Sequence, residues 1–300
     1  MTTPASSPQP AQTGPAVLST SGLTKRYGRD TWALRDINLA VPAGGVTALI
    51  GPNAAGKSTL LKTWVGFERP THGSVAVSEV DPWRDRSAAL SHLAYVAQRP
   101  SLYAELTGDE HFTLARHLRA GFDTDAARRR LAQLGIPSDR AVGELSGGQA
   151  AQLSLAIALG THADVLLLDE PLASLDPLAR REFLTVLREA VAADGSTALL
   201  SSHVVSDVVE GCDRLLVLGV GRLLLHAPIA DALNEHTVVE SPDGHDPSSS
   251  DLISVFVGQN GEQLALVRSG PRRGRRSATL EEIVVGYLTA GRADERRMAA

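Results

Sequence analysis

A phosphate-binding loop is indicated by residues 51–58, which fit the spacing G-x-x-x-x-G-K-[ST]. A β-rich apolar run, residues 46–50, precedes the loop, and residues 60–64 have helical character, as this motif requires. The two glycines let the backbone turn its N–H groups inward, and the dipole of the following helix favours the same anion. The residues expected around the phosphates are Gly51, Pro52, Asn53, Ala54, Ala55, Gly56, Lys57, Ser58 and Thr59.

Two side chains of this loop could act on a nucleotide directly. Lys57 is expected to reach the β- and γ-phosphates, and the hydroxyl of Ser58 is expected to bind Mg²⁺. The chain contains only three lysines among its 29 Lys and Arg residues, so a lysine here is a specific choice of a compact ammonium charge. The alternative is a strand-to-helix turn that binds nothing, and the strand and helix around the loop argue against it.

A second anion site is indicated by the sequence Leu-Ser-Gly-Gly-Gln at residues 145–149, directly before the helical run 150–159. A hydroxyl, flexible backbone N–H groups and a helix N-terminus then face the same way. Because one chain seldom needs two separate phosphate sites, this second motif requires an explanation of its own. The residues concerned are Ser146, Gly147, Gly148 and Gln149.

Two carboxylates and a histidine follow predicted strands. Residues 164–170 read as a buried parallel strand that ends in Asp169 and Glu170. Asp169 is expected to hold Mg²⁺ through water, and Glu170 could polarise an attacking water. A helix cap or a surface pair is the alternative for these carboxylates. His203 follows the strand predicted at 196–202, at the edge where open α/β sheets bind ligands.

The composition limits the classes of function. With 300 residues and 43% hydrophobic content the chain can bury a large core, and its net charge of −5 disfavours nucleic acid as a partner. A single cysteine, Cys212, excludes a disulfide framework and a multi-cysteine metal site. We find neither an apolar run long enough to span a membrane nor a signal segment. We therefore expect a cytoplasmic protein whose membrane role, if any, comes through a partner.

The remaining elements position these residues. Residues 1–15 are predicted to be a disordered tail, and two antiparallel strands, from residue 16 onward and at 32–41, lead to the phosphate loop. Tyr27 lies between them and could stack on a base or simply pack. Short strands are predicted at 74–77 and 93–97, the second ending at Gln98. Residues 107–134 are predicted to be a helical insertion whose arginines (Arg116, Arg119, Arg128, Arg129 and Arg130) form a solvated face.

The C-terminal part has its own local signals. Residues 240–250 have linker composition, and two strands at 251–257 and 263–267 are predicted to form a hairpin that turns at 260–261. Thr279 and Glu282 form a capping box that opens a final helix through Leu288. The basic segment 271–276 is either a solvated loop or a contact for anionic lipid headgroups.

Taken in order, these motifs make residues 17–233 resemble the nucleotide-binding subunit of an ATP-binding cassette (ABC) transporter. The resemblance implies an α/β fold: a P-loop NTPase, RecA-like core with an antiparallel β subdomain and a helical insertion at about 100–151. It places the ATPase domain at 16–234 and leaves 235–300 as a linker and a small α+β C-terminal extension. This extension resembles ABC-2-type exporter subunits more loosely.

The resemblance also implies roles, with ATP and Mg²⁺ as cofactors. Glu170 would be the general base, assisted by His203 and Lys57, and Mg²⁺ would lie near Ser58, Gln98 and Asp169. Tyr27 would stack on adenine. In a head-to-tail dimer, Ser146 of one subunit would face the γ-phosphate held by Lys57 of the other. The partners would be a second nucleotide-binding subunit, identical or a sister, and a separate membrane permease reached through Gln98 on the cytoplasmic face.

The sequence departs from the family pattern at two places. Ala54 stands where glycine is usual, which would cost about 1–3 kcal/mol if the position needs positive φ. Ala150, Ala151 and Gln152 replace a segment that usually contains a basic residue, which would weaken contacts at the dimer interface.

We predict an ATP-hydrolysing motor of a transporter. The short insertion before residue 145 and the C-terminal extension favour export over import. One alternative is a soluble ABC-type ATPase acting on ribosomes or DNA. Such proteins carry two cassettes in one chain or a long coiled coil, whereas this sequence has one signature motif, at 145–149, and no sustained heptad pattern. Another is a catalytically weak regulatory cassette, suggested by Ala54 and Ala150.

Overall fold

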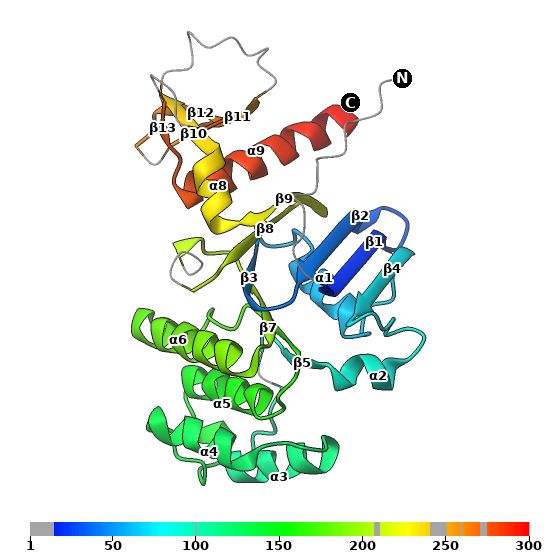
Figure 1. Ribbon diagram of the computed structural model, residues 1–300, viewed down its shortest axis with the longest axis vertical. Helices are drawn as coiled ribbons and strands as arrows, with labels where there is room; N and C mark the ends of the chain where they lie inside the picture. Colours follow the sequence, from blue (N-terminus) through cyan, green and yellow to red (C-terminus); the bar gives the residue numbers. More distant parts are fainter. Residues whose placement is uncertain are drawn as a thin grey trace.

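The computed structural model describes residues 15–99, 101–206, 211–240, 251–258, 260–270 and 275–299. The tail at 1–14, the linker at 241–250 and the basic residues 271–274, for which predictions were made, lie outside this range. Within it, the strands form sheets of six, three and four strands, and Figure 1 shows how helices surround them.

The six-stranded sheet carries the strand ends that matter for chemistry. Its order is β5 (Leu93–Val96), β6 (Val165–Asp169), β7 (Thr197–Ser202), β3 (Gly45–Ile50), β8 (Arg214–Gly219) and β9 (Arg222–Pro228). All neighbours are parallel except β8 and β9. The strands β6 and β7 are buried throughout, as expected for a parallel sheet covered on both faces. The carboxyl ends of β3, β6 and β7 therefore meet at one edge.

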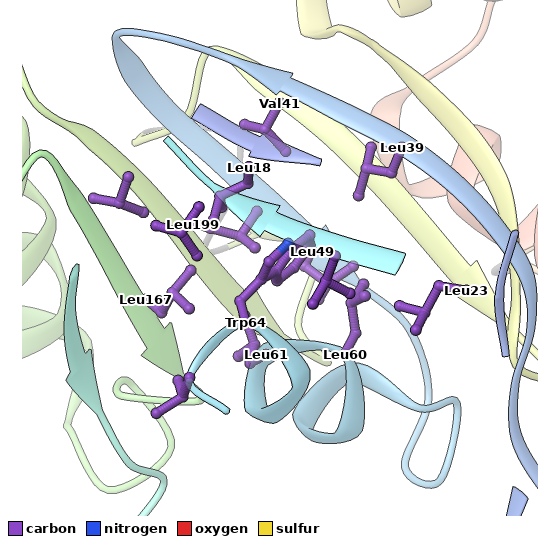
Figure 2. Close-up of a cluster of buried hydrophobic side chains, with 14 of the residues drawn as sticks. Leu18, Leu23, Leu39, Val41, Leu49, Leu60, Leu61, Trp64, Leu167 and Leu199 are labelled. Carbon is purple, nitrogen blue, oxygen red and sulfur yellow. The ribbon is translucent and has the colours of Figure 1, made fainter. Parts of the chain in front are cut away.

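Helices and a second sheet cover the two faces. Helix α1 (Lys57–Trp64) packs on one face, where Trp64 is buried in one cluster with Leu49, Leu167 and Leu199 (Figure 2). Helices α5 (Gly147–Leu159) and α6 (Pro177–Asp194) contribute to the core on the other face. The antiparallel sheet β2 (Thr31–Pro42), β1 (Ala16–Tyr27) and β4 (His72–Val77) closes over α1, and Trp64 Nε1 donates a hydrogen bond of 3.1 Å to Ser19 O.

The helical insertion differs in detail from its prediction. The stretch predicted at 107–134 is two helices, α3 (Gly108–Leu118) and α4 (Thr124–Gln133), because Gly121 has φ 80° and Asp123 caps a new helix. A further short helix, α2 (Arg86–Ser91), precedes β5, and a 3₁₀ turn (Val142–Glu144) precedes α5. One arginine is not on a solvated face. The guanidinium of Arg119 donates to two carbonyl oxygens at 3.0 Å each, those of Leu90 in α2 and of Leu93, the first residue of β5.

The C-terminal part contains the predicted hairpin and capping box. Strands β11 (Leu252–Val257) and β12 (Gln263–Arg268) pair antiparallel, followed in the sheet by β10 (His236–Glu240) and β13 (Arg276–Ser277). Thr279 and Glu282 exchange hydrogen bonds of 2.8 and 3.2 Å at the start of α9 (Leu280–Ala299). The helix runs well past the predicted Leu288 because Ala, Arg and Glu, all good helix formers, continue it.

This extension shares a hydrophobic core with the six-stranded sheet. Ile50, the last residue of β3, and Val217, within β8, lie in one cluster with Ile283 and Val284 of α9. Helix α8 (Ile229–Glu235) links β9 to the extension, and α9 lies beside β8 and β9 (Figure 1). No helix of the described segments is long and apolar enough to cross a bilayer. The fold is therefore the predicted α/β core with an antiparallel β subdomain, a helical insertion and an α+β extension.

Candidate functional site

The loop at 51–56 needs glycine at both of its ends. A Cβ at Gly51 would lie 2.2 Å from Leu218 O, and one at Gly56 would lie 2.4 Å from Ala33 O. Gly56 also has φ 104°. Between them, Ala54 has φ 66°, so the position does adopt the left-handed region that disfavours alanine, at a cost of about 1–3 kcal/mol.

The N-terminus of the helix that follows is suited to binding an anion. Helix α1 has no side-chain cap and no acidic residue in its first turn. By contrast, a side chain caps each of α2 to α6 at its N-terminus. The first N–H groups of α1 are therefore left to another acceptor, and its dipole favours negative charge. A phosphate group fits both the glycine loop and this helix terminus.

Lys57 is a buried cation with full hydrogen bonding. Its side chain is 4% exposed, and its Nζ donates to Gly51 O at 2.7 Å and Pro52 O at 3.2 Å. The same nitrogen lies 3.0 Å from Oε1 of Glu170. The lysine predicted from the loop and the carboxylate predicted from the strand end thus meet directly.

Asp169 collects hydroxyl groups from three other elements. Its Oδ1 accepts from Ser58 Oγ at 3.0 Å and from Ser201 Oγ at 2.9 Å, and its Oδ2 accepts from Tyr95 at 3.3 Å. Burial, and then the charge of Asp169, raise the pKa of the Tyr95 phenol, which keeps this group a donor. Ser201 and Tyr95 were not predicted from the sequence. The available signal for Ser201 was its place one residue before the end of β7, a strand that the sequence predicts.

Glu170 lies at the centre of a second group of contacts. Its Oε2 is 3.1 Å from Nδ1 of His203 and accepts a long hydrogen bond of 3.4 Å from Gln98 Nε2. Its backbone N–H donates to Ser201 Oγ at 2.9 Å, and its φ of 47° turns the side chain away from the strand direction. The side chain is 9% exposed, so it reaches solvent only through a small opening.

A cavity of about 40 Å³ opens beside this carboxylate, lined among others by Glu170, Ser201, Ser202 and His203. A larger cavity, of about 520 Å³, lies along α6 at the opposite end of β3 and contacts none of the predicted site residues. We place the chemistry at the smaller cavity because the titratable side chains converge there.

Magnesium fits the oxygen atoms around Asp169. A serine hydroxyl and a carboxylate 3.0 Å apart are hard donors of the kind that Mg²⁺ prefers. Among the described residues there is no group of three or more His, Cys, Asp or Glu side chains that could hold a metal. Mg²⁺ is usually held by one or two protein groups together with phosphates and water.

Tyr27 lies at the end of β1 and remains open to solvent. Its side chain is 40% exposed, and Lys25 Nζ lies 4.9 Å from the ring centroid. Burial raises the pKa of Tyr27, whereas a hydrogen bond with Thr59 of α1 opposes that rise, so the phenol lies near the phosphate loop. Stacking of adenine on this ring stays a prediction.

The motif at 145–149 lies elsewhere. Ser146 is the exposed N-cap of α5, where its Oγ accepts from Gln149 N at 3.2 Å and its N–H donates to Gln149 Oε1 at 3.0 Å. Gly147 and Gly148 lie beside Ser174 and Leu175. Figure 1 places α5 with α3 and α4, away from α1.

The structure thus sorts the predicted site residues into two places. No hydrogen bond or ion pair of the described residues joins Ser146 to the loop at 51–58. One cluster forms at the sheet edge, and a second, separate surface carries the motif at 145–149. The residues that the structure brings together at the sheet edge are Lys57, Ser58, Gln98, Asp169, Glu170 and His203.

A glycine loop between the first core strand and an uncapped helix, with acidic residues at a neighbouring strand end, defines a P-loop nucleotide-binding protein. Comparison with known proteins agrees. The family model described as "ABC transporter" matches residues 34–173. A solved structure titled cbiO1 from Clostridium perfringens, part of the ABC transporter complex cbiONQ, superimposes with a TM-score of 0.62 at 27% identity, covering 71% of this chain and 89% of that one.

Curated relatives give the same assignment. The aliphatic sulfonates import ATP-binding protein SsuB 1 of Rhizobium johnstonii is 35% identical over 74% of this chain and 80% of its own length. The probable multidrug ABC transporter ATP-binding protein YbhF of Escherichia coli is 37% identical over 70% of this chain. The match spans only 37% of the length of YbhF. The chain belongs to the family of ABC transporter ATP-binding proteins.

Proposed function

We propose that the chain is the ATP-driven motor subunit of an exporter, working on the cytoplasmic face of a membrane with a separate permease. The contact between Lys57 and Glu170 carries the proposal. A cation suited to phosphates and a carboxylate suited to activating water lie 3.0 Å apart at one sheet edge, beside an uncapped helix.

The side chains at this edge have distinct proposed roles. Lys57 balances the charge of the β- and γ-phosphates, and Glu170 takes the proton of the attacking water as general base. His203, 3.1 Å from the Glu170 carboxylate, orients that water and contacts the γ-phosphate. Ser58 and Asp169 hold Mg²⁺, which supplies positive charge to the phosphate oxygens.

We further propose that two such chains, identical or sister cassettes, close head to tail around ATP. The separation of Ser146 from the phosphate loop supports this, since a motif suited to phosphate has no phosphate loop near it in its own chain. Ser146 of one subunit would then meet the γ-phosphate bound by its partner. Closing and opening of the pair would drive the permease between inward- and outward-facing states.

The direction of transport is the second half of the proposal. YbhF carries a multidrug name, whereas SsuB 1 carries an import name, so relatives of both kinds match. The C-terminal extension and the short insertion favour export. A substrate-binding protein that co-purifies with the assembled transporter would overturn this direction, since import of that type depends on one.

The variant Glu170→Gln tests the chemistry. The amide cannot accept the proton of water, so we expect ATP hydrolysis to fall at least ~100-fold while ATP binding persists. Light scattering with saturating Mg-ATP should then show a stable dimer. Hydrolysis near the wild-type rate would remove Glu170 from the role of base, and a monomer under these conditions would contradict the head-to-tail pair.

Mass spectrometry of what co-purifies with tagged Glu170→Gln in mild detergent and ATP tests the partner. We expect a membrane protein with several spanning segments, enriched over an untagged control. If ribosomal or DNA-bound proteins co-purify in place of a membrane protein, the proposed ATPase activity stands and the proposed role in transport is wrong.

A further inference from the structure

We infer that helix α9 of the C-terminal extension positions the phosphate loop, acting through the hairpin between β8 and β9. The inference rests on the proposed nucleotide site and adds a part of the chain that none of its motifs includes. Three sets of contacts carry it, from the loop to the hairpin, from the hairpin to α9, and from α9 to the rest of the extension.

The hairpin turn supports the phosphate loop from behind. Gly221 N donates a hydrogen bond of 3.2 Å to Ala55 O, and Gly221 O accepts one of 2.7 Å from Arg35 N. The approach of Leu218 to Gly51 is so close that a Cβ at Gly51 would lie 2.2 Å from Leu218 O. The hairpin and the phosphate loop are packed this closely, so there is no space for either to move towards the other. A shift of the hairpin towards the loop must therefore displace the loop.

Helix α9 contacts the same hairpin through Leu224 of β9. A Cβ at Gly219, the last residue of β8, would lie 2.6 Å from Leu224 Cδ1 and 3.1 Å from Leu288 Cδ2. A Cβ at Gly291 of α9 would lie 2.9 Å from Leu224 Cδ1, and the three atoms nearest to it all belong to Leu224. The Leu224 side chain is therefore held between two glycines, one in the hairpin and one in the helix.

A second contact joins α9 to the strand behind the loop. Glu295 Oε1 lies 3.5 Å from a guanidinium nitrogen of Arg35, the residue whose backbone N–H binds the hairpin turn. This pair is partly exposed, so its contribution to stability is small. The location of the pair is informative, because it shows that the C-terminal part of α9 lies beside β2.

The opposite side of α9 is fixed to the extension sheet. A Cβ at Gly286 would lie 2.4 Å from Leu266 Cδ2, and Ser254 Oγ donates to Gly286 O at 2.7 Å. The helix therefore lies between the extension sheet and the hairpin with close contacts on both sides. Leu224, Leu288 and Gly291 are positioning residues, which act on nucleotide binding through the backbone of the loop.

The variant Gly291→Leu tests this inference in the full-length chain. The added leucine would meet the terminal carbons of Leu224, so the Leu224 side chain must move, and because Leu224 also packs against Gly219 of the hairpin, we expect that movement to be passed to the hairpin. We expect the Kd for the non-hydrolysable analogue AMP-PNP to rise at least ~5-fold, while kcat at saturating ATP stays within about 2-fold of wild type, because Gly291 touches no reacting group. The matched control is Ala293→Leu, the same side chain on the exposed face of the same helix, which should bind as wild type does.

A double variant separates positioning from general damage. Leu224→Ala removes the atoms that the new leucine meets, so Gly291→Leu combined with Leu224→Ala should recover most of the lost affinity. A folded Gly291→Leu protein with wild-type affinity for AMP-PNP would overturn the inference. If Gly291→Leu does not fold, Leu288→Ala takes its place, with the same expected loss of affinity and the same overturning result.

Two reference proteins separate a failure of the proposed nucleotide site from a failure of the role proposed for α9. Wild type should bind AMP-PNP, and Lys57→Ala should not. If wild type does not bind the analogue, the proposed nucleotide site fails. If wild type binds and Gly291→Leu binds equally well, only the role of α9 fails.

Discussion

Two helix N-termini in this chain carry sequence motifs for phosphate, and they are built differently. Helix α1 leaves its first N–H groups without a side-chain cap and places a buried lysine beside them. Helix α5 satisfies its own terminus with the reciprocal pair of Ser146 and Gln149, on an exposed surface. The first terminus is arranged for a ligand within the chain, whereas the second is stable without one and suits a contact that forms only on docking.

A phosphate motif in the sequence therefore does not by itself show whether its site is complete within one chain. A glycine loop that excludes every Cβ at its ends is fixed in advance by its neighbours, here Leu218 and Ala33. A capping box, by contrast, occurs in many helices with no ligand, and α3 of this chain has one, formed by Thr107 and Glu110. Three substitutions test whether the two helix N-termini work in these different ways.

The largest effect is expected at the first terminus. Lys57→Ala removes the charge that faces the phosphates and leaves Glu170 buried without its cation. We expect AMP-PNP affinity to fall at least ~100-fold in titration calorimetry. Lys62→Ala, in the last turn of the same helix, is the control and should bind normally. Equal losses in both variants would mean that lysine charge in general, and not its location, supports binding.

A smaller effect is expected at the second terminus, and it should be confined to turnover. Ser146→Ala removes the hydroxyl that would meet the partner's γ-phosphate, so we expect kcat to fall about tenfold, equivalent to one hydrogen bond to a charged group. ATP affinity of the single subunit should change less than about 2-fold, since Ser146 is not part of its own phosphate loop. Steady-state ATPase assays and analogue titrations measure the two quantities separately.

The capping box of α3 supplies the matched control. Thr107→Ala removes the same kind of cap from a neighbouring helix, at a similar cost of about 1 kcal/mol in stability. Both variants should lower the melting temperature by similar amounts, and only Ser146→Ala should slow turnover. If Thr107→Ala slows it equally, loss of the cap explains the effect and the docking role of Ser146 is wrong.

The smallest effect is expected within the loop itself. Ala54 has φ 66°, and Ala54→Gly would remove about 1 kcal/mol of backbone strain. We expect a modest rise in melting temperature and nucleotide affinity up to about 5-fold tighter. Ala55→Gly, at a buried position of the same loop without positive φ, should lower stability, which would show that the benefit belongs to the left-handed backbone at Ala54.

The sequence predicted the site best where the chemistry depends on neighbours in the chain. The glycine loop, the carboxylates after β6 and the cap of α5 are local patterns, and each lies on the expected element. The pairing of Asp169 with Ser201 and Tyr95 was not predictable, because it depends on which strands lie side by side. The order β5, β6, β7, β3 places these residues together, and nothing in the spacing of the motifs reveals it.

The C-terminal part illustrates the same limit on a larger scale. Its hairpin and its capping box follow from short patterns, whereas the packing of α9 against the β8–β9 hairpin does not. An amphipathic helix shows that one face must be buried, and its sequence does not name the surface that covers it. Arg119 is a similar case, since an arginine predicted to be solvated binds the end of α2.

The hydrophobic cluster that joins Ile50 and Val217 to Ile283 and Val284 determines how the chain comes apart. Because apolar side chains from both parts are buried against each other, a chain cut short after residue 235 would leave apolar side chains of β3 and β8 in the six-stranded sheet exposed to water. Such a fragment would tend to aggregate, although it keeps every nucleotide-binding motif. In the intact chain we expect the two parts to melt together in a single transition. The domain boundary predicted from the motifs, at residues 234–235, should then not separate two independently stable units.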